Sequence, residues 1–379
     1  MKRKKLIILG CTGSIGRNAA TVFKANKDYF EVVGISAHTD ESNLMKFAQT
    51  FNVKKVCLTG RKPSYPGINF EGSDGLLEMI RETEADVVLN GISGSAGLSS
   101  SIATLESGKD LACANKETIV MAGELILKLA EENKASIIPV DSEHSAIWQL
   151  IRGFNKEYIA ELILTASGGA FRNRSIQSLK NVTVSAALAH PTWEMGPKIT
   201  IDSATMANKG LEIIEAHFLF GIPAEKIKIV VHPKSYVHSL VRTIDGYLYS
   251  QISLPDMSIP IQNALSWPEI IPANFAALDL PGVSLEFQKL DELKYPIVKS
   301  AYSALEKLGA YPIVFNAANE VAVSSFVDDS ICFTDIASVV EQTMMLDWPG
   351  KVDSFEHITS IDSEVRAITT ELIEKIRQV

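Results

Sequence analysis

The fold is decided near the N-terminus by the stretch Leu6-Ile7-Ile8-Leu9-Gly10-Cys11-Thr12-Gly13-Ser14-Ile15-Gly16. Its four apolar residues predict a buried strand, and the glycine-rich turn after them predicts a helix that begins near Ser14. Glycines let the backbone approach a pyrophosphate, and the N–H groups at the start of a helix face that anion. The spacing is G-x-x-G-x-x-G, because Cys11 occupies the first glycine position of the usual G-x-G-x-x-G, so the motif needs support from its surroundings.

The surroundings of this motif favour a doubly wound α/β domain over residues 1–140. Helical patterns alternate with five further apolar runs, which is the rhythm of βαβ units. These runs are Val32–Ile35, Lys55–Leu58, Ala85–Leu89, Leu111–Ala114 and Ile137–Val140. The sequence therefore predicts a Rossmann-like parallel sheet that binds a dinucleotide.

The end of the second predicted strand indicates which dinucleotide binds. An NAD site usually places Asp or Glu there to hold the ribose 2′-hydroxyl, whereas this chain has Ser36. The missing acid favours NADPH, with Ser36, His38 and Thr39 as donors to its 2′-phosphate.

A positive charge for that phosphate is absent from the predicted turn itself, and Asp40 would repel the phosphate. Arg61 and Lys62 follow the third strand. They either supply the charge or lie in a solvated loop.

The composition argues against several classes of protein. The chain has 379 residues, enough for two or three domains, and a net charge of −9, which speaks against a general nucleic-acid binder. The apolar run after Lys2–Lys5 is too short for a signal peptide, and no run reaches the ~18 residues of a membrane span. The four cysteines match no zinc spacing, so we expect reduced thiols in a cytoplasmic protein.

Asp141 and Glu143 form the sharpest acidic site of the chain. In an extended segment their side chains point to the same side. Two carboxylates ~4 Å apart repel by about 4 kcal/mol at an effective dielectric of about 20, and Glu212 adds to this repulsion unless a divalent cation lies among the three. Oxygen ligands favour Mg²⁺ or Mn²⁺ over zinc.

The segment His190–Lys198 combines two prolines and a glycine with the large apolar side chains of Trp193 and Met195. Such a loop suits a lid, placed here at residues 187–197, that closes over a ligand and excludes water. The alternative is an ordinary loop followed by an amphipathic helix with a solvated polar face.

Two nearby patterns suit an anion. Ser203, Asn208 and Lys209 offer a hydroxyl, an amide and an ammonium, and the last two share a helix face with Glu212. Ser167-Gly168-Gly169 follows a predicted strand and is either a phosphate nest or a plain turn.

Lys116 stands where the fifth predicted strand ends, at the carboxyl edge at which open α/β sheets bind ligands. It either holds a substrate hydroxyl or carbonyl oxygen or is simply solvated.

The remaining chain predicts two further domains. Residues 141–271 read as an α+β catalytic domain, with strands at Lys226–Val231, Val237–Thr243 and Tyr247–Ser253. Residues 272–292 read as a linker, and residues 293–379 as a small helical bundle. We find no catalytic candidate in the bundle, although its polar segment Asn316–Glu320 could close one side of the active site.

Several of these motifs together resemble the 1-deoxy-D-xylulose 5-phosphate reductoisomerase family. In family order they are Gly10–Gly16, Ala114–Glu117, Pro139–His144, Ser167–Gly169, His190–Glu212 and Phe315–Glu320. The resemblance implies an NADP-dependent oxidoreductase of the non-mevalonate isoprenoid pathway that also requires a divalent metal. It would isomerise 1-deoxy-D-xylulose 5-phosphate and reduce the product to 2-C-methyl-D-erythritol 4-phosphate. It also implies a homodimer and inhibition by fosmidomycin.

The resemblance implies a role for each matching position. The metal ligands would be Asp141, Glu143 and Glu212, for Mg²⁺ or Mn²⁺, with Co²⁺ as a further candidate, and Lys116 and His190 would complete the catalytic set. The substrate would contact Lys116, Ser142, Glu143, Ser167, His190, Trp193, Met195, Ser203, Asn208, Lys209 and Glu212. NADPH would contact Thr12, Gly13, Ser14, Ile15, Asn115, Glu117 and Gly196.

The chain departs from the family pattern at His38-Thr39-Asp40, where a turn like Gly-Lys-Asn is expected, which leaves open how the 2′-phosphate is held. Two rival classes remain. A phospho-sugar or amino-acid-semialdehyde dehydrogenase would need no site of three carboxylates. A non-catalytic nucleotide sensor or scaffold would have little reason to keep these acids together with Lys116 and Lys209.

Overall fold

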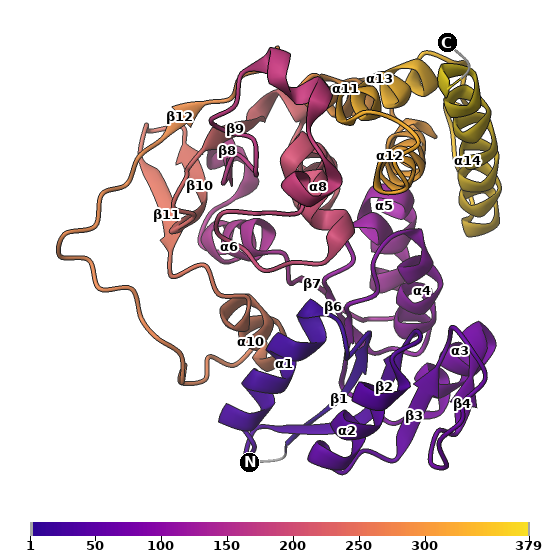
Figure 1. The fold of residues 1–379 in the computed structure, drawn as a ribbon. Coiled ribbons are helices and arrows are strands. Elements are labelled where there is room, and N and C mark those ends of the chain that lie inside the picture. The colour runs from indigo at the N-terminus through magenta and orange to yellow at the C-terminus, as the bar shows by residue number, and fades with distance from the viewer. Residues whose placement is uncertain (1–2, 378–379) are drawn as a thin grey trace. The chain divides into compact units, whose positions relative to one another are not determined.

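The structure is a computed structural model that describes residues 3–377. The chain forms two compact units, which are described separately. The first is built from residues up to Thr118, from Ile126–Ser145 and from Asp256–Ala277, and the second from Ile119–Leu125, Ala146–Pro255 and the residues from Leu278 onward. Figure 1 labels most of the elements along the chain.

The first unit contains a seven-stranded parallel sheet in the order β4-β3-β2-β1-β5-β6-β7 (Figure 1). Its strands are β1 (Lys4–Leu9), β2 (Phe30–Ala37), β3 (Lys55–Leu58), β4 (Phe70–Glu71), β5 (Val87–Asn90), β6 (Asp110–Cys113) and β7 (Ile137–Pro139). The strand order reverses at β1, whose residues Leu6–Leu9 are completely buried. The parallel pairing and the reversal of strand order at β1 confirm the doubly wound sheet. The burial of β1 agrees with this, because the central strand of such a sheet is covered on both faces.

Helices follow the strands of this sheet. They are α1 (Ser14–Ala25), α2 (Glu41–Phe51), α3 (Gly72–Glu82), α4 (Leu98–Glu106), α5 (Lys116–Glu132) and α6 (Ser142–Ile151). A later helix, α10 (Ser258–Ser266), returns to this unit, where Asn26 donates to Gln262 at 3.0 Å.

The second unit contains a five-stranded sheet in the order β11-β10-β8-β9-β12. Its strands are β8 (Ile159–Ala166), β9 (Ile227–Val231), β10 (Val237–Thr243), β11 (Leu248–Ile252) and β12 (Gln288–Lys289). The pairs β8–β10, β10–β11 and β9–β12 are antiparallel, whereas β8 and β9 are parallel. A parallel pair needs a long crossover, and α7 (Val184–Ala187), α8 (Pro197–Thr205) and α9 (Ala207–Phe220) lie in it.

The C-terminal part of the second unit is helical, as the sequence predicts. Its helices are α11 (Ile297–Lys307), α12 (Tyr311–Val327), α13 (Phe333–Met344) and α14 (Phe355–Arg377). The helix α12 packs between neighbours, because most of its residues are buried, including the polar Asn316 and Asn319. The segment before α11 is irregular apart from β12, which pairs with β9.

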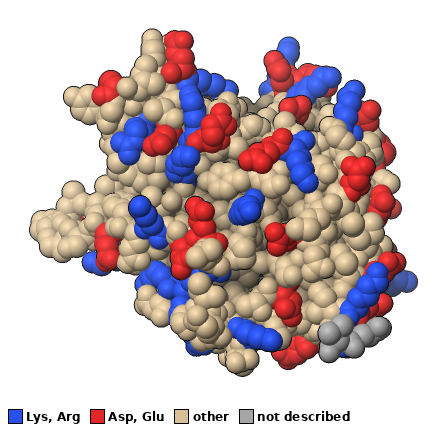
Figure 2. All heavy atoms as spheres, turned by 90° about the horizontal axis from the view of Figure 1, so that it is seen from above, with Lys and Arg blue, Asp and Glu red and all other residues tan. Residues whose placement is uncertain are grey.

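The described surface carries both signs of charge. On the face shown in Figure 2, Lys and Arg side chains are interspersed with Asp and Glu side chains. None of the helices within residues 3–377 combines the length and the apolar character needed to cross a membrane.

Candidate active site

The turn between β1 and α1 requires glycine at both ends. Gly10 has φ +71°, and a Cβ there would lie 2.9 Å from the carbonyl oxygen of Gly91. A Cβ on Gly16 would lie 2.2 Å from the carbonyl oxygen of Cys11. The first turn of α1 holds no acidic residue, so the positive end of the helix faces the Gly13 turn without a competing carboxylate.

One residue at the end of β2 hydrogen-bonds to this glycine-rich turn. Ser36 is buried, and its Oγ accepts a hydrogen bond of 3.3 Å from the N–H of Gly10. His38 and Thr39 are exposed beyond it. The Ser36 side chain therefore fixes the glycine turn, whereas the next two polar residues face outward.

Asp40 and Arg61 have roles that the sequence leaves open. The carboxylate of Asp40 accepts hydrogen bonds from the backbone and side-chain nitrogens of Asn43 and caps α2, and these bonds lower the pKa of Asp40. Arg61 donates from Nε to the carbonyl of Thr39 at 3.2 Å and pairs with the buried Glu41 at 2.7 Å. The structure thus places a guanidinium on the turn that follows β2.

The start of α5 is organised by Asn115. Its side chain accepts the N–H of Thr118 at 3.0 Å and donates to the carbonyls of Ile92 and Gly94, each at 2.8 Å. Its amide also lies 3.1 Å from Glu117. The side chain of Asn115 therefore ties the end of β6 to the loop after β5, where dinucleotides bind in such sheets.

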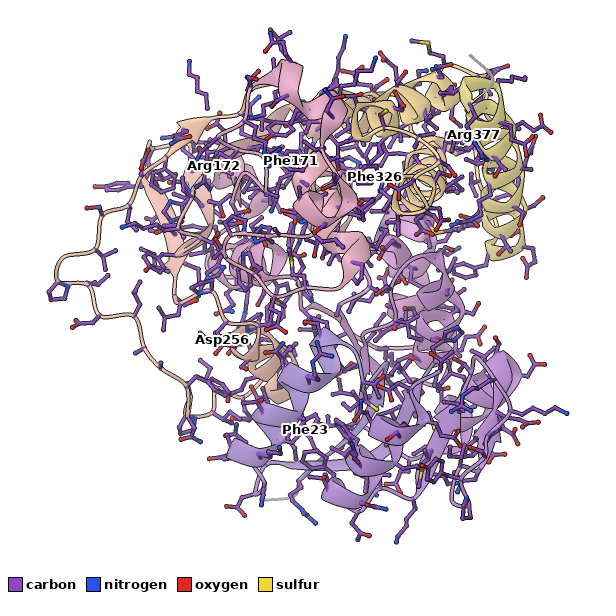
Figure 3. The ribbon with its side chains drawn as sticks, viewed as in Figure 1. Phe23, Phe171, Arg172, Asp256, Phe326 and Arg377 are labelled. Carbon is purple, nitrogen blue, oxygen red and sulfur yellow. The ribbon has the colours of Figure 1, made fainter. Side chains whose placement is uncertain are left out.

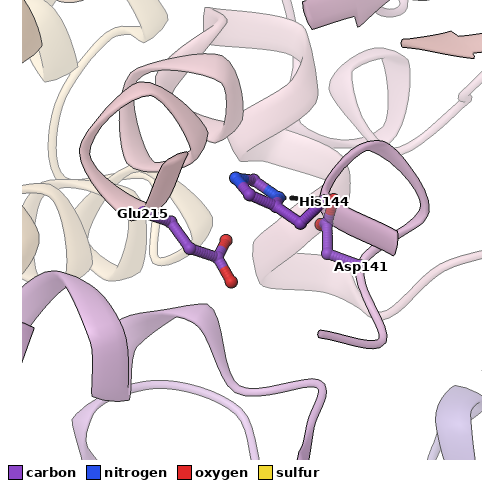
Figure 4. Close-up of side chains that lie close together, drawn as sticks. All are labelled: Asp141, His144 and Glu215. Carbon is purple, nitrogen blue, oxygen red and sulfur yellow. Dashed lines mark hydrogen bonds and ion pairs between the residues drawn. The ribbon is translucent and has the colours of Figure 1, made fainter. Parts of the chain in front are cut away.

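Asp141 follows β7, and both oxygens of its carboxylate contact neighbouring groups. Lys116 donates to its Oδ2 at 2.7 Å, and His144 Nδ1 and the N–H of Glu143 lie 3.1 and 3.2 Å from its Oδ1. Figure 4 shows the His144–Asp141 pair. The ammonium of Lys116 therefore offsets the negative charge of this carboxylate.

The expected extended geometry of Asp141-Ser142-Glu143 is wrong. Helix α6 begins at Ser142, so Glu143 lies in its first turn, and Ser142 Oγ donates to Glu143 at 2.6 Å. A carboxylate is favourable there because of the helix dipole.

In the second unit, α9 brings Asn208, Lys209 and Glu212 together on one face, as their spacing predicts. Asn208 Nδ2 and Lys209 Nζ each lie 2.5 Å from a carboxylate oxygen of Glu212. Glu212 is completely buried and Lys209 is 5% exposed. The two anion donors therefore also balance a buried carboxylate.

Ser167 follows β8 and contacts His190 at 2.9 Å, between Oγ and Nε2. The Nδ1 of His190 accepts the N–H groups of Thr192 and Trp193 at 3.1 and 2.8 Å, so the neutral ring carries its proton on Nε2. Burial, aided by the charge of Arg172, lowers the pKa of His190 to about 4. His190 is therefore a neutral donor at Nε2.

The Ser167-Gly168-Gly169 turn makes backbone contact with α8. Both glycines have positive φ, and a Cβ on Gly169 would lie 2.4 Å from the carbonyl oxygen of Ser203. Of the predicted anion-binding residues, Ser167 and Ser203 thus lie on two segments that touch, and α9 continues directly from α8 through Met206.

The segment from His190 to Gly196 has no helix or strand, and α8 begins directly after it with Pro197. Trp193 and Met195 are half-buried. The indole of Trp193 lies edge-on to the ring of His238, with centroids 6.2 Å apart.

Lys294 and Tyr295, which donate to carbonyls of the Ser167–Arg174 segment, were missed from the sequence, which carries no signal for them. Asn319 donates to Asp202 on α8, and it lies in the polar segment Asn316–Glu320 that the sequence singles out.

The comparisons with known proteins agree over the whole chain. Family models described as 1-deoxy-D-xylulose 5-phosphate reductoisomerase and its two C-terminal domains match residues 6–123, 137–220 and 252–368. The reductoisomerase of Chlorobium phaeobacteroides is 43% identical over 98% of this chain and 100% of its own length. That of Treponema denticola is 43% identical over 97% of each chain.

Solved structures give the same result. A reductoisomerase crystallised with NADPH, fosmidomycin and magnesium has a TM-score of 0.91 and 38% identity, with 99% of each chain covered. The Zymomonas mobilis enzyme in complex with NADPH has a TM-score of 0.90 and 37% identity, covering 98% of this chain and 100% of its own. Full-length similarity at this identity shows that the chain belongs to the 1-deoxy-D-xylulose 5-phosphate reductoisomerase family.

Proposed function

We propose that this chain isomerises 1-deoxy-D-xylulose 5-phosphate and reduces the product to 2-C-methyl-D-erythritol 4-phosphate, with NADPH and a divalent cation. Membership of the family over nearly the full length carries this proposal. Two related enzymes of known structure bind NADPH, and one of them also binds magnesium and fosmidomycin. The glycine-rich turn of the first unit fits the cofactor, and the donor-rich turn of the second unit fits the phosphate of the substrate.

Asp141, Glu143 and Glu212 are the proposed metal ligands. Their oxygen donors suit Mg²⁺ or Mn²⁺, and the ammonium groups of Lys116 and Lys209 lie beside Asp141 and Glu212. When bound, the cation would act as a Lewis acid on the carbonyl and hydroxyl oxygens of the substrate. Lys116 already points its ammonium at Asp141, so a substrate oxygen bound next to that carboxylate would be within its reach.

Ser167, Ser203, Asn208 and Lys209 are the proposed phosphate ligands. They come from the turn after β8, from α8 and from α9, three segments that the Gly169–Ser203 contact and the α8–α9 junction join. The N–H groups of Gly168 and Gly169 add backbone donors. His190 supplies a fixed Nε2–H, and Trp193 and Met195 are the apolar residues that would exclude water on closure.

NADPH is proposed to bind across the Thr12–Ile15 turn, with Asn115, Glu117 and Gly196 as further contacts. His38, Thr39 and Arg61 are the proposed donors to its 2′-phosphate. The contact of Arg61 with the Thr39 carbonyl supports this, and the capping role of Asp40 turns that carboxylate toward α2.

A homodimer in the cytoplasm is the proposed state of the protein. The edge strand β11 exposes Leu248, Tyr249 and Ile252, and Tyr247 before it is 66% exposed. An apolar edge of this kind favours pairing with another strand, here from a second copy. All four cysteines are free thiols, which fits a reducing compartment. Sedimentation equilibrium should give twice the chain mass.

The decisive experiment measures NADPH oxidation with 1-deoxy-D-xylulose 5-phosphate after the metal has been removed, and again after Mg²⁺ or Mn²⁺ is added. Activity should depend on added metal, and mass spectrometry should identify the methylerythritol phosphate. Full activity in metal-free enzyme, or NADPH oxidation without that product, would exclude the proposal.

A further inference from the structure

Lys294 makes an unusual set of contacts just before α11. Its Nζ donates to three backbone carbonyls, those of Phe171, Arg172 and Arg174, at 2.7, 2.8 and 2.7 Å. The side chain is 9% exposed. An ammonium has three donors and no acceptor, so these three carbonyls satisfy it completely.

The three carbonyls belong to the segment that follows the proposed phosphate-binding turn. Arg172 in turn donates from its guanidinium to the carbonyl of Ser167. The phenol of Tyr295 donates to the carbonyl of Gly168 at 3.3 Å. Two consecutive side chains, Lys294 and Tyr295, therefore hold both ends of residues 168–174.

The same segment is fixed from its other side by aromatic packing. Phe171 is buried and lies edge-on to Phe333 of α13, with ring centroids 4.9 Å apart, and Phe333 packs on Phe326 of α12. Figure 3 labels Phe171, Arg172 and Phe326. The helical bundle thus anchors the segment after Ser167 through both polar and apolar contacts.

The place of Lys294 is set by a short turn. Its N–H donates to the side chain of Asp291 at 3.1 Å, and the N–H groups of Lys294 and Tyr295 contact the carbonyl of Asp291 at 3.2 and 3.1 Å. Burial lowers the pKa of Lys294, and Asp291 opposes that effect. Burying a lysine without a carboxylate partner raises the free energy of the folded state. The hydrogen bonds to the three carbonyls must offset this, so the lysine contributes to the fold by holding those carbonyls in place.

We infer that Lys294, together with Tyr295, is a positioning residue for substrate-phosphate binding. It holds residues 168–174 so that Gly169 lies against the Ser203 backbone and its N–H donates to Ser167 Oγ at 3.2 Å, which fixes the turn that carries Ser167. Because all three donors of its Nζ are used by backbone carbonyls, Lys294 acts in this inference only through residues 168–174. This inference rests on the proposed function of the Ser167 turn and assigns to the helical bundle a part in substrate affinity.

The test compares Lys294→Met, which keeps the length and removes the donors, with Lys294→Arg, which keeps a cationic donor. Lys299→Met is the matched control, because Lys299 lies in α11 five residues later and is exposed. Steady-state kinetics of the metal-loaded enzyme should give KM for the substrate, and fluorescence titration should give Kd for NADPH and for fosmidomycin. Hydrogen exchange of residues 167–175 reports on the turn directly.

Lys294→Met should raise KM and the Kd of fosmidomycin by about tenfold to a hundredfold while the Kd of NADPH changes less than about twofold. Exchange in residues 167–175 should accelerate, Lys294→Arg should restore much of the loss, and the control should match wild type. An unchanged KM in folded Lys294→Met would overturn the inference, as would equal losses for NADPH and fosmidomycin.

Two outcomes keep the inference separate from the proposed function. Should Lys294→Met fail to fold, Tyr295→Phe decides, since it removes only the bond to Gly168: a raised KM with an unchanged Kd for NADPH supports the inference, and an unchanged KM overturns it. If wild-type enzyme shows no reductoisomerase activity, the proposed function fails. Hydrogen exchange then still tests whether Lys294 orders residues 167–175, and a wild-type rate in Lys294→Met removes the inference.

Discussion

Asn319 of α12 donates a hydrogen bond of 2.8 Å from Nδ2 to Oδ1 of Asp202 on α8, and both side chains are almost completely buried. Lys198, at the start of the same helix, lies 3.1 Å from the other oxygen of Asp202. Asp202 precedes Ser203, and α8 begins where the proposed lid ends. The Asp202–Asn319 pair therefore fixes the helix to which the lid is attached.

Replacement of Asn319 by Ala should destabilise the protein by about 1–3 kcal/mol, because a buried carboxylate loses one of its donors. The KM for the substrate should rise more than the Kd of NADPH. Thermal unfolding and steady-state kinetics would measure both effects. Wild-type stability and KM would show that the pair has no positioning role.

Glu212→Gln should lower kcat by at least about a hundredfold, because the neutral amide is a poor ligand for a hard cation. Lys209 keeps the single amide oxygen as its acceptor in this variant, and the amide of Asn208 can turn its own oxygen toward the new NH2 group, so the fold should persist. Isothermal titration with Mn²⁺ should show weaker metal binding, and the Kd of NADPH should be unchanged. A normal kcat would rule out Glu212 as a ligand.

Trp193→Ala should weaken the binding of substrate and fosmidomycin by about tenfold, since the variant loses most of a large apolar surface over the ligand. Binding of NADPH should change less. Kinetics and fluorescence titration provide the comparison, and unchanged KM and kcat would remove the lid assignment.

Arg61→Ala should reduce the preference for NADPH over NADH. A hydrogen bond to a charged group contributes about 1.5–3 kcal/mol, so the Kd of NADPH should rise roughly tenfold to a hundredfold while that of NADH stays constant. Glu41 keeps its bonds from Ser64 and Tyr65, which should preserve the turn. Equal effects on both cofactors would contradict a specific role.

His190 gives the protein a defined pH dependence. Its pKa falls from the ordinary 6.5 to about 4 on folding, so the unfolded chain binds more protons between these values. This group should therefore lower stability as pH falls from 6.5 toward 4 and contribute no slope above 6.5. His190→Gln should show a smaller loss of Tm between pH 6.5 and 4.5 than wild type, and parallel curves would refute the assignment.

The sequence predicts regular elements well where one local pattern decides them. The strand Val237–Thr243 and the hairpin turn at Asp245-Gly246 are confirmed, because alternation and turn chemistry both act locally. The two-residue strand β4 has too few residues for any periodicity. The start of α6 at Ser142 was missed because a run ending in Pro139-Val140 suggests an extended chain that continues through Glu143.

Site residues could be predicted from the sequence where their side chains contact one another at helical spacing, as Asn208, Lys209 and Glu212 do. Lys294 could not be found in this way. Its acceptors are backbone carbonyls more than a hundred residues earlier, and a carbonyl has no sequence signature. Asp40 shows the same limit. From the sequence, an acid beside a nucleotide turn could either repel a phosphate or cap the next helix, and only the position of α2 shows that Asp40 caps it.

Cys11 is 1% exposed within the glycine-rich turn, and burial raises the pKa of its thiol to about 12. Cys57 and Cys113 are also buried, whereas Cys332 is exposed. Maleimide or iodoacetamide dyes react with accessible thiolates, so a native preparation should take up one label per chain, at Cys332 directly before α13. A spectroscopic probe can therefore be attached without mutating the dinucleotide turn.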